Sequence, residues 1–292
     1  MKSIKLTVPF QSINADKKKR RIEIPCLKFD VPYNFRNDYE KINQIELDNE
    51  YAYVSVNVKE DPQIVPQGWI GVDLNTTGHV AVVGNPDTGK ILKLGKEALH
   101  IHTKYRNIRK NMQKKGKYGV VKMIRNRESR IIKDINHNIA KKIVETAREN
   151  NTGIKFEKLE GIRGNIKHKR NFNYGLHSWS FYQLQQFTEY EAKLCGIPLT
   201  YVEPKYTSQD CSRCGNRGIR DSKKFVCSQS LEIIQGVVFQ LGCGHVDHAD
   251  ANAAFNISQR PSISQVEEGR SQLHTDRDVC KGSTDTPQGA TL

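Results

Sequence analysis

The sequence predicts an α/β protein in which a mixed sheet with flanking helices follows a small β domain and carries an inserted cysteine-rich metal site. Residues 1–66 alternate apolar and polar positions in short stretches such as IKLTVPF, RIEIPCLKF and EYAYVSVNV, and this period of two is typical of strands. Three further strand-like stretches, WIGVDL, HVAVVG and KILKLG, precede two long segments with helical periodicity. Four cysteines then cluster between Cys211 and Cys243.

The elements after residue 67 follow in a regular order. A helix is expected over about 97–115, and the helix after it carries apolar residues at spacings of seven and four, namely Ile124, Ile131, Ile135, Ile139, Ile143 and Ala147. A short strand then ends at Glu157. A helix over 179–194 and a final strand in IPLTYVEP complete the order, with four core residues expected on that helix, Phe181, Leu184, Phe187 and Tyr190.

The segment GNPDTGK, residues 84–90, has the spacing of a phosphate-binding loop. Ile91 stands where that loop needs a Ser or Thr for magnesium, and a strand rather than a helix follows. We therefore interpret this segment as a hairpin turn.

Three acidic residues lie where apolar elements begin or end. Asp73 follows the run WIGV, Glu157 follows IKF, and Asp250 opens the short amphipathic helix of HADANAAFNI. Each acid alone is typical of a solvated carboxylate at the end of a strand or helix. Hard divalent cations take oxygen ligands, and phosphodiester cleavage by two magnesium ions needs the ions held about 4 Å apart. The three acids together therefore indicate a magnesium site.

The cysteines indicate a second metal. The segment CSRCG has the close spacing of a zinc knuckle, but Ser230 stands where a partner for the next cysteine is expected. The apolar stretch LEIIQGVVFQL looks like an inserted hairpin, and a four-thiolate site forms if this hairpin loops out. His245 or His248 as a substitute ligand, or a site damaged by the insertion, are the alternatives. The expected zinc ligands are Cys211, Cys214, Cys227 and Cys243.

The chain has seven cysteines, and the odd number favours metal binding in a reducing compartment over a disulfide framework. Its net charge of +14 indicates a polyanionic partner. No run of about 18 apolar residues is present, and the segment MKSIKLTVPF is too short and mixed for a signal peptide. We therefore expect a cytoplasmic protein without a membrane partner.

Basic residues concentrate on the two predicted helices. Between residues 104 and 142 there are fourteen Lys or Arg but only two acids. This segment is either a solvated helical surface or a surface that binds the backbone of an RNA or DNA strand. Binding of the second kind loses affinity steeply as the salt concentration rises. We favour the surface that binds nucleic acid. The basic loop GNIKHKRNFNYGLHS carries aromatic residues that either stack on bases or pin the loop to the core. The expected contacts are Lys104, Arg106, Arg109, Lys110, Lys114, Arg125, Arg127, Lys167, Lys169 and Arg170.

Five segments, GVDLN, FEKLEGIR, HSWSFYQL, TSQDCSRCG and CGHVDHADANAAFNI, resemble the RuvC-like nuclease and zinc-ribbon region of the TnpB (OrfB) family of insertion sequences, which is related to type V CRISPR effectors. The similarity covers roughly residues 68–257. It implies an RNase H-like (RuvC-type) fold, a structural zinc ion, a guide RNA from the protein's own locus and a DNA target. By motif it assigns magnesium to Asp73, Glu157 and Asp250. The N-terminal part is much shorter than in that family and has no room for its helical segment.

The predicted organisation is a short β domain over 1–66, the first part of the nuclease over 67–208, a zinc ribbon with an insertion over 209–246 and the nuclease C-terminal helix over 247–258. Residues 259–292 lack periodicity and are rich in Ser, Thr, Gln, Asp and Gly, so we expect a disordered tail.

The function that follows is a transposon-associated, RNA-guided DNA endonuclease in a prokaryotic cell, associated with the nucleoid. Its three acids hold two magnesium ions, one activating water and one stabilising the leaving 3′ oxygen. The alternative is a nucleic-acid-binding regulator that no longer cuts, or a truncated transposase-accessory remnant. Strand transfer is disfavoured because no Tyr lies in a recognisable HUH-type context.

Overall fold

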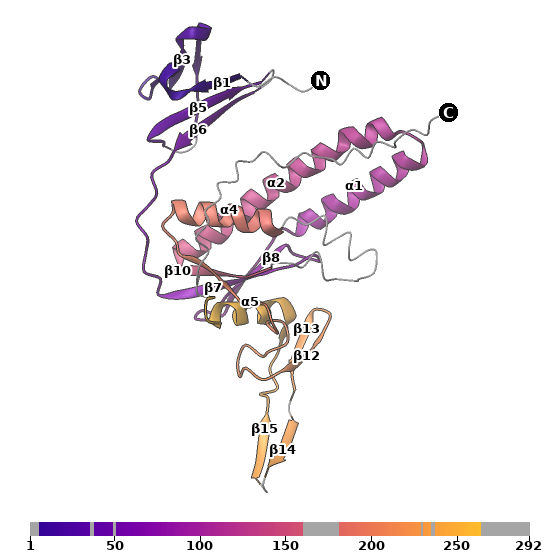
Figure 1. Cartoon of the computed structure of the whole chain (residues 1–292). Helices are drawn as coiled ribbons and strands as arrows, with labels where there is room; N and C mark the ends of the chain where they lie inside the picture. The colour runs from indigo at the N-terminus through magenta and orange to yellow at the C-terminus, as the bar shows by residue number, and fades with distance from the viewer. Residues whose placement is uncertain are drawn as a thin grey trace, which may run out of the picture. The chain divides into compact units, whose positions relative to one another are not determined.

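The computed structural model describes residues 6–35, 38–48, 51–159, 181–228, 230–234 and 237–263 (Figure 1). Three predicted nucleic-acid contacts, Lys167, Lys169 and Arg170, lie outside these ranges, and the side chain of Arg125 is likewise outside the described part. The same is true of the rest of the basic loop and of residues 264–292 of the predicted tail.

The N-terminal part is built from strands, as its alternating pattern predicts. One antiparallel sheet joins β1 (Leu6–Pro9), β5 (Lys41–Leu47) and β6 (Ala52–Asn57), and a second joins β2 (Asn14–Asp16), β3 (Arg21–Ile24) and β4 (Phe29–Pro32). Their inward residues form a common core that includes Ile22, Ile24, Ile42 and Ile45. The described residues of this part contain two short 3-10 turns, η1 (Phe10–Ser12) and η2 (Pro25–Leu27), and no α-helix.

The central sheet is mixed, which confirms the predicted class. Its strands lie in the order β11 (Leu199–Val202), β10 (Thr152–Glu157), β7 (Gly68–Leu74), β8 (Ala81–Asn85) and β9 (Lys90–Leu94). Strand β10 runs parallel to both β7 and β11, whereas β7, β8 and β9 are antiparallel. A tight turn joins β8 to β9, so the GNPDTGK segment is the hairpin turn that we expected.

Helices cover both faces of this sheet (Figure 1). On one face lie α1 (Lys96–Lys114), α2 (Tyr118–Glu149) and α4 (Phe181–Leu194), and on the other lies α5 (Ala249–Gln259). Successive side chains of a strand point to opposite faces. Ile70, Val72, Ile154 and Phe156 are buried in the core shared with α2 and α4. The residues that alternate with them, which include Asp73 and Glu157, therefore face α5.

The helical periodicity predicted part of the core. Ile139, Ile143 and Ala147 of α2 and Leu184 of α4 are buried. Tyr190 was expected in the core and is instead 55% exposed, because it lies on the outward side of α4. Helix α5 was predicted to be amphipathic, but its polar side does not face solvent, since nine of its eleven residues are buried.

A small β unit precedes α5 and carries the cysteines. Its sheet joins β12 (Gly218–Asp221), β13 (Lys224–Cys227) and β16 (Val246–His248), all antiparallel. The predicted inserted hairpin is present as β14 (Ser230–Ile234) and β15 (Val237–Leu241), which pair with each other. We call residues 207–228 and 242–248 the cysteine module.

Residues 259 and 260, which we expected to begin a disordered tail, are instead part of the fold. Gln259 closes α5, and Arg260 after it is hydrogen-bonded to three groups of the 203–210 segment. No helix among the described residues is long and apolar enough to cross a membrane.

Candidate active site and cysteine cluster

Asp73 and Glu157 lie side by side at one edge of the central sheet. Phe156 of β10 pairs with Val72 of β7 in parallel register, and each acid is the next residue after this pair. Parallel neighbours in register point to the same face. The structure thus brings together two acids that are 84 positions apart, because 157 minus 73 is 84.

The third acid is delivered by α5, which packs unusually close to β7. A methyl group added at Gly71 would lie 2.0 Å from the carbonyl oxygen of Ala254, so only glycine permits this approach. Asp250, the second residue of α5, is 2% exposed. It comes near enough to Asp73 to act on the pKa of that residue.

The site is electrostatically costly without a cation. Burial, then the charge of Glu157 and also that of Asp250, raise the pKa of Asp73 to about 8, although a hydrogen bond from Asn75 at 2.8 Å opposes the shift. Burial also raises the pKa of Glu157, and a hydrogen bond from the Thr207 hydroxyl opposes that shift. Buried like charges raise one another's pKa in this way.

Asp250 has two basic partners that sequence reasoning missed. Arg220 Nη2 lies 3.0 Å from its Oδ1, and Lys223 Nζ lies 2.6 Å from its Oδ2. Lys223 also donates to the carbonyl oxygen of Thr77, after β7, at 3.3 Å. The β12–β13 hairpin therefore supplies positive charge to the acidic site.

The donor set fits magnesium. Three carboxylates are the oxygen ligands that this ion prefers, and a divalent cation would relieve the repulsion that raises the pKa of Asp73. The three carboxylates nevertheless do not form a group as compact as the cysteine cluster among the described residues.

The four predicted cysteines gather at one point, although the hairpin β14–β15 separates Cys227 from Cys243. All four sulfur atoms lie within 4.8 Å of one another. Cys211 Sγ is 3.7 Å from Cys243 Sγ, and Cys214 Sγ is 3.5 Å from Cys227 Sγ. Tetrahedral zinc with Zn–S bonds of about 2.3 Å places its sulfurs roughly 3.8 Å apart. The cluster therefore fits a zinc ion.

The two histidines considered as substitute ligands are placed elsewhere. His245 Nε2 lies 3.5 Å from Asp247, and His248 Nδ1 lies 3.9 Å from Asp250. Neither belongs to the group of four thiols. Ser230 begins β14.

The basic residues of α1 and α2 divide into two kinds. Lys104, Arg106, Lys110 and Lys114 on α1 and Arg127 on α2 are exposed. Arg109, also predicted as a nucleic-acid contact, is half-buried and bonds to Glu128 on α2. His102 bonds to the same carboxylate at 2.9 Å. Burial opposes ionisation of Glu128, but these two bonds hold its pKa below its usual value.

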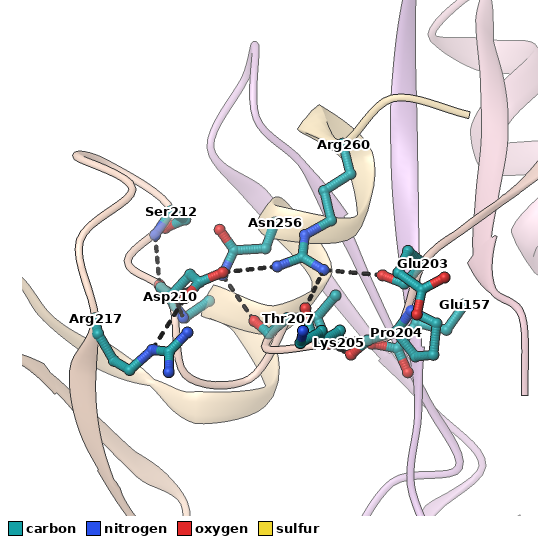
Figure 2. A network of polar contacts seen from close by, with 11 residues as sticks. Glu157, Glu203, Pro204, Lys205, Thr207, Asp210, Ser212, Arg217, Asn256 and Arg260 are labelled. Carbon is teal, nitrogen blue, oxygen red and sulfur yellow. Dashed lines mark hydrogen bonds and ion pairs between the residues drawn. The ribbon is translucent and has the colours of Figure 1, made fainter. Parts of the chain in front are cut away.

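A polar network around the acids was also missed. Thr207, Asp210, Asn252, Asn256 and Arg260 connect Glu157, α5 and the cysteine module, and Figure 2 shows most of them. One sequence signal was available. Asn252 and Asn256 are polar residues four apart in an alanine-rich helix, and this spacing places both on one face.

Several known proteins are similar to this chain. The family described as Cas12f1-like, TNB domain, matches residues 181–257. The chain is 27% identical to a TnpB-like protein of Aquifex aeolicus, over 68% of this chain and 69% of the relative. It is 29% identical to a TnpB-like protein of Methanocaldococcus jannaschii, over 61% and 72% of the two chains.

Cas12f proteins match over less of their length. A Cas12f1 endodeoxyribonuclease of Sulfoacidibacillus thermotolerans is 27% identical, over 74% of this chain and 51% of the relative. A solved CRISPR-Cas12f ternary complex has a TM-score of 0.52 at 19% identity, covering 77% of this chain and 47% of that chain. A Cas12f1–sgRNA–target DNA complex also has a TM-score of 0.52, at 20% identity, covering 75% and 45%. The chain thus spans about half the length of these Cas12f proteins. It is similar in sequence to TnpB-like and Cas12f proteins.

Proposed function

We propose that this protein is a magnesium-dependent, RNA-guided DNA endonuclease with an RNase H-like (RuvC-type) catalytic core and a structural zinc ribbon. The observation that carries the proposal is the convergence of Asp73, Glu157 and Asp250 from β7, β10 and α5 on one face of the mixed sheet. A strand order with the first strand central, flanked by a hairpin on one side and two parallel strands on the other, supports the RNase H-like core.

In this proposal the protein's own groups divide the work of hydrolysing a phosphodiester. The three carboxylates hold magnesium, which when bound supplies activation of water and stabilisation of the leaving oxygen. Arg220 and Lys223 place positive charge beside Asp250, where a phosphate oxygen would approach. The buried position of Asp73 keeps bulk water away from its carboxylate and strengthens every charge interaction there.

The partners follow from the relatives and from charge. One structural neighbour is a Cas12f1 complex with sgRNA and target DNA, and we propose the same classes of partner here, with the guide transcribed from the protein's own locus. The exposed basic residues of α1 and α2 supply a surface for one of the strands. We propose a transposon-associated role by similarity to the TnpB-like relatives.

The test is magnesium-dependent cleavage of labelled DNA by protein co-expressed with RNA from its own locus. Asp73→Ala, Glu157→Gln and Asp250→Asn should each abolish cutting while leaving nucleic-acid binding nearly intact, because none of these substitutions removes a basic residue. Asp87→Asn, an exposed acid in the β8–β9 turn, is the control and should cut like the parent protein. Substantial cutting by Asp73→Ala would contradict the assignment.

A second candidate is a nucleic-acid-binding regulator that does not cut. It is favoured by one observation, the engagement of both Asp250 oxygens by Arg220 and Lys223, which leaves that carboxylate already neutralised. Tight binding without cutting under all magnesium concentrations would support this candidate.

A further inference from the structure

The backbone of the first zinc-knuckle segment is bonded directly to the polar face of α5. Asn252 Nδ2 donates to the carbonyl oxygen of Asp210 at 2.8 Å, and Asn252 Oδ1 accepts from the backbone N–H of Ser212 at 2.9 Å. These two residues flank Cys211. Asn256 Nδ2 donates to the same Asp210 carbonyl at 2.7 Å. The position of Cys211 is therefore tied to a helix whose second residue is Asp250.

The same segment also holds the other end of the acidic site. The Thr207 hydroxyl donates to Glu157 Oε1, and the Thr207 carbonyl accepts from Asn256 Nδ2 at 2.8 Å (Figure 2). Thr207 is 4% exposed, so water does not compete freely for these bonds. A single residue thus links Glu157 on the sheet to the polar face of α5.

Arg260 closes the network from the far end of α5. Its Nη2 lies 2.7 Å from Asp210 Oδ2, and its Nη1 donates to the carbonyl oxygen of Glu203 at 2.8 Å and to that of Lys205. Figure 2 shows this guanidinium between the 203–210 segment and the helix. The 203–210 segment, which leads into the cysteine module, is consequently hydrogen-bonded to residues near both ends of α5.

We propose that the zinc knuckle and the acidic site are one coupled unit, in which Thr207 and Asn252 are positioning residues that transmit the zinc-bound geometry of Cys211 to Glu157 and Asp250. This inference rests on the proposed nuclease function. Zinc fixes the knuckle backbone, the knuckle fixes α5 through Asn252, and Thr207 orients the Glu157 carboxylate. Loss of zinc, or of the Thr207 or Asn252 side chain, makes the positions of the Glu157 and Asp250 carboxylates less fixed. These carboxylates are the proposed ligands of a divalent cation.

Coupling of this kind must act in both directions, because linked equilibria are reciprocal. Loosening α5 at Asn252 should therefore weaken the hold of the knuckle on zinc, even though Asn252 does not touch a cysteine sulfur. Removing only the Thr207 hydroxyl leaves the knuckle contacts with Asn252 intact. It should weaken divalent-cation binding without changing zinc release.

The experiment compares Asn252→Ala, Thr207→Val and Thr207→Ser with the parent protein and with Asn14→Ala, an exposed residue of β2. Zinc release to a chromogenic chelator is timed first, and Mn2+ affinity is then measured by electron paramagnetic resonance without nucleic acid. Asn252→Ala should release zinc several-fold faster and bind Mn2+ roughly tenfold more weakly. Thr207→Val should lose Mn2+ affinity alone, and Thr207→Ser should retain it. Asn256→Ala, which keeps the Ser212 bond, replaces Asn252→Ala if that variant does not fold.

Parental zinc release and parental Mn2+ affinity in both Asn252→Ala and Thr207→Val would overturn the coupling. The zinc measurement needs neither magnesium nor a guide, so it separates this inference from the proposed function. A parent protein that holds zinc but binds no Mn2+ contradicts the nuclease site, whereas faster zinc release from Asn252→Ala would still support the link between knuckle and helix.

Discussion

A carboxylate buried beside other carboxylates destabilises a fold unless it keeps its proton or meets a cation. Asp73 is in this position, since burial and the charge of Glu157 raise its pKa to about 8. In the unfolded chain the same group ionises near pH 4. The folded state therefore binds a proton that the unfolded state has released between about pH 4 and pH 8, and stability should fall as the pH rises through this window.

Asp73→Asn should for this reason stabilise the magnesium-free protein at pH 8 by about 1–3 kcal/mol, with a gain that shrinks toward pH 5. Urea denaturation at the two pH values measures it, with Asp87→Asn as the control for the same change at an exposed site. Added magnesium should stabilise the parent protein more than the variant. An identical difference at both pH values would show that Asp73 is already ionised in the fold.

At the scale of single elements, the sequence predicted most of what regular periodicity can indicate. Strands β7 to β10 and helices α1, α2 and α4 follow the apolar patterns of their segments. Strand β5 was missed because Asn43 and Gln44 interrupt its alternation, and the structure has a register shift at that point. The three acids and four cysteines were recognised by their positions at element ends and by spacing.

The partners of those residues were not predictable in the same way. Arg220 and Lys223 reach Asp250 only because the β12–β13 turn folds back onto the start of α5. Such contacts depend on tertiary geometry, and the hydrophobic periodicity of the sequence does not predict them. The pairing of Arg109 with Glu128 was missed for the same reason, since it depends on how α1 packs on α2.

The close approach of α5 to β7 gives a direct test at this scale. Gly71→Ala places a methyl group 2.0 Å from the Ala254 carbonyl oxygen and 2.6 Å from the Ser258 nitrogen. Both contacts are backbone, so α5 must shift, at a cost of about 1–3 kcal/mol or more. Thermal unfolding and cleavage should both be impaired. Gly119→Ala, which meets open space in α2, should be neutral or slightly stabilising, and a fully stable, active Gly71→Ala protein would show that the helix packs less closely.

Zinc loading tests the cysteine module. Cys243→Ser should lower bound zinc from about one ion per chain to a small fraction, because a structural site needs all four ligands. Metal analysis of purified protein measures this directly. Cys26→Ser, at an exposed cysteine outside the cluster, is the matched control, and equal zinc in the two variants would contradict a four-thiolate site.

At the scale of the whole molecule, the net charge of +14 favours a polyanionic partner. The exposed cations of α1 and α2 contribute to this field, whereas Arg109 is engaged with the buried Glu128. Neighbouring positions on one helix are therefore predicted to have different roles, and two neutral substitutions test this.

Lys110→Gln should weaken nucleic-acid binding and reduce the slope of affinity against salt by about one unit, with stability unchanged. Arg109→Gln should instead cost about 1–3 kcal/mol of stability, because it leaves the Glu128 carboxylate with fewer partners. Binding titrations at several salt concentrations and urea denaturation distinguish the two. The reverse pattern would place Arg109 in the binding surface.

The central claim is that three acids from β7, β10 and α5 form one magnesium-dependent cutting site. Its most direct test is cleavage of labelled target DNA by protein co-purified with RNA from its own locus, with and without magnesium, beside Asp73→Asn. Cutting that requires magnesium, the RNA and Asp73 is the predicted result. Cutting that persists in Asp73→Asn, or nucleic-acid binding with no cutting at any magnesium concentration, would contradict it.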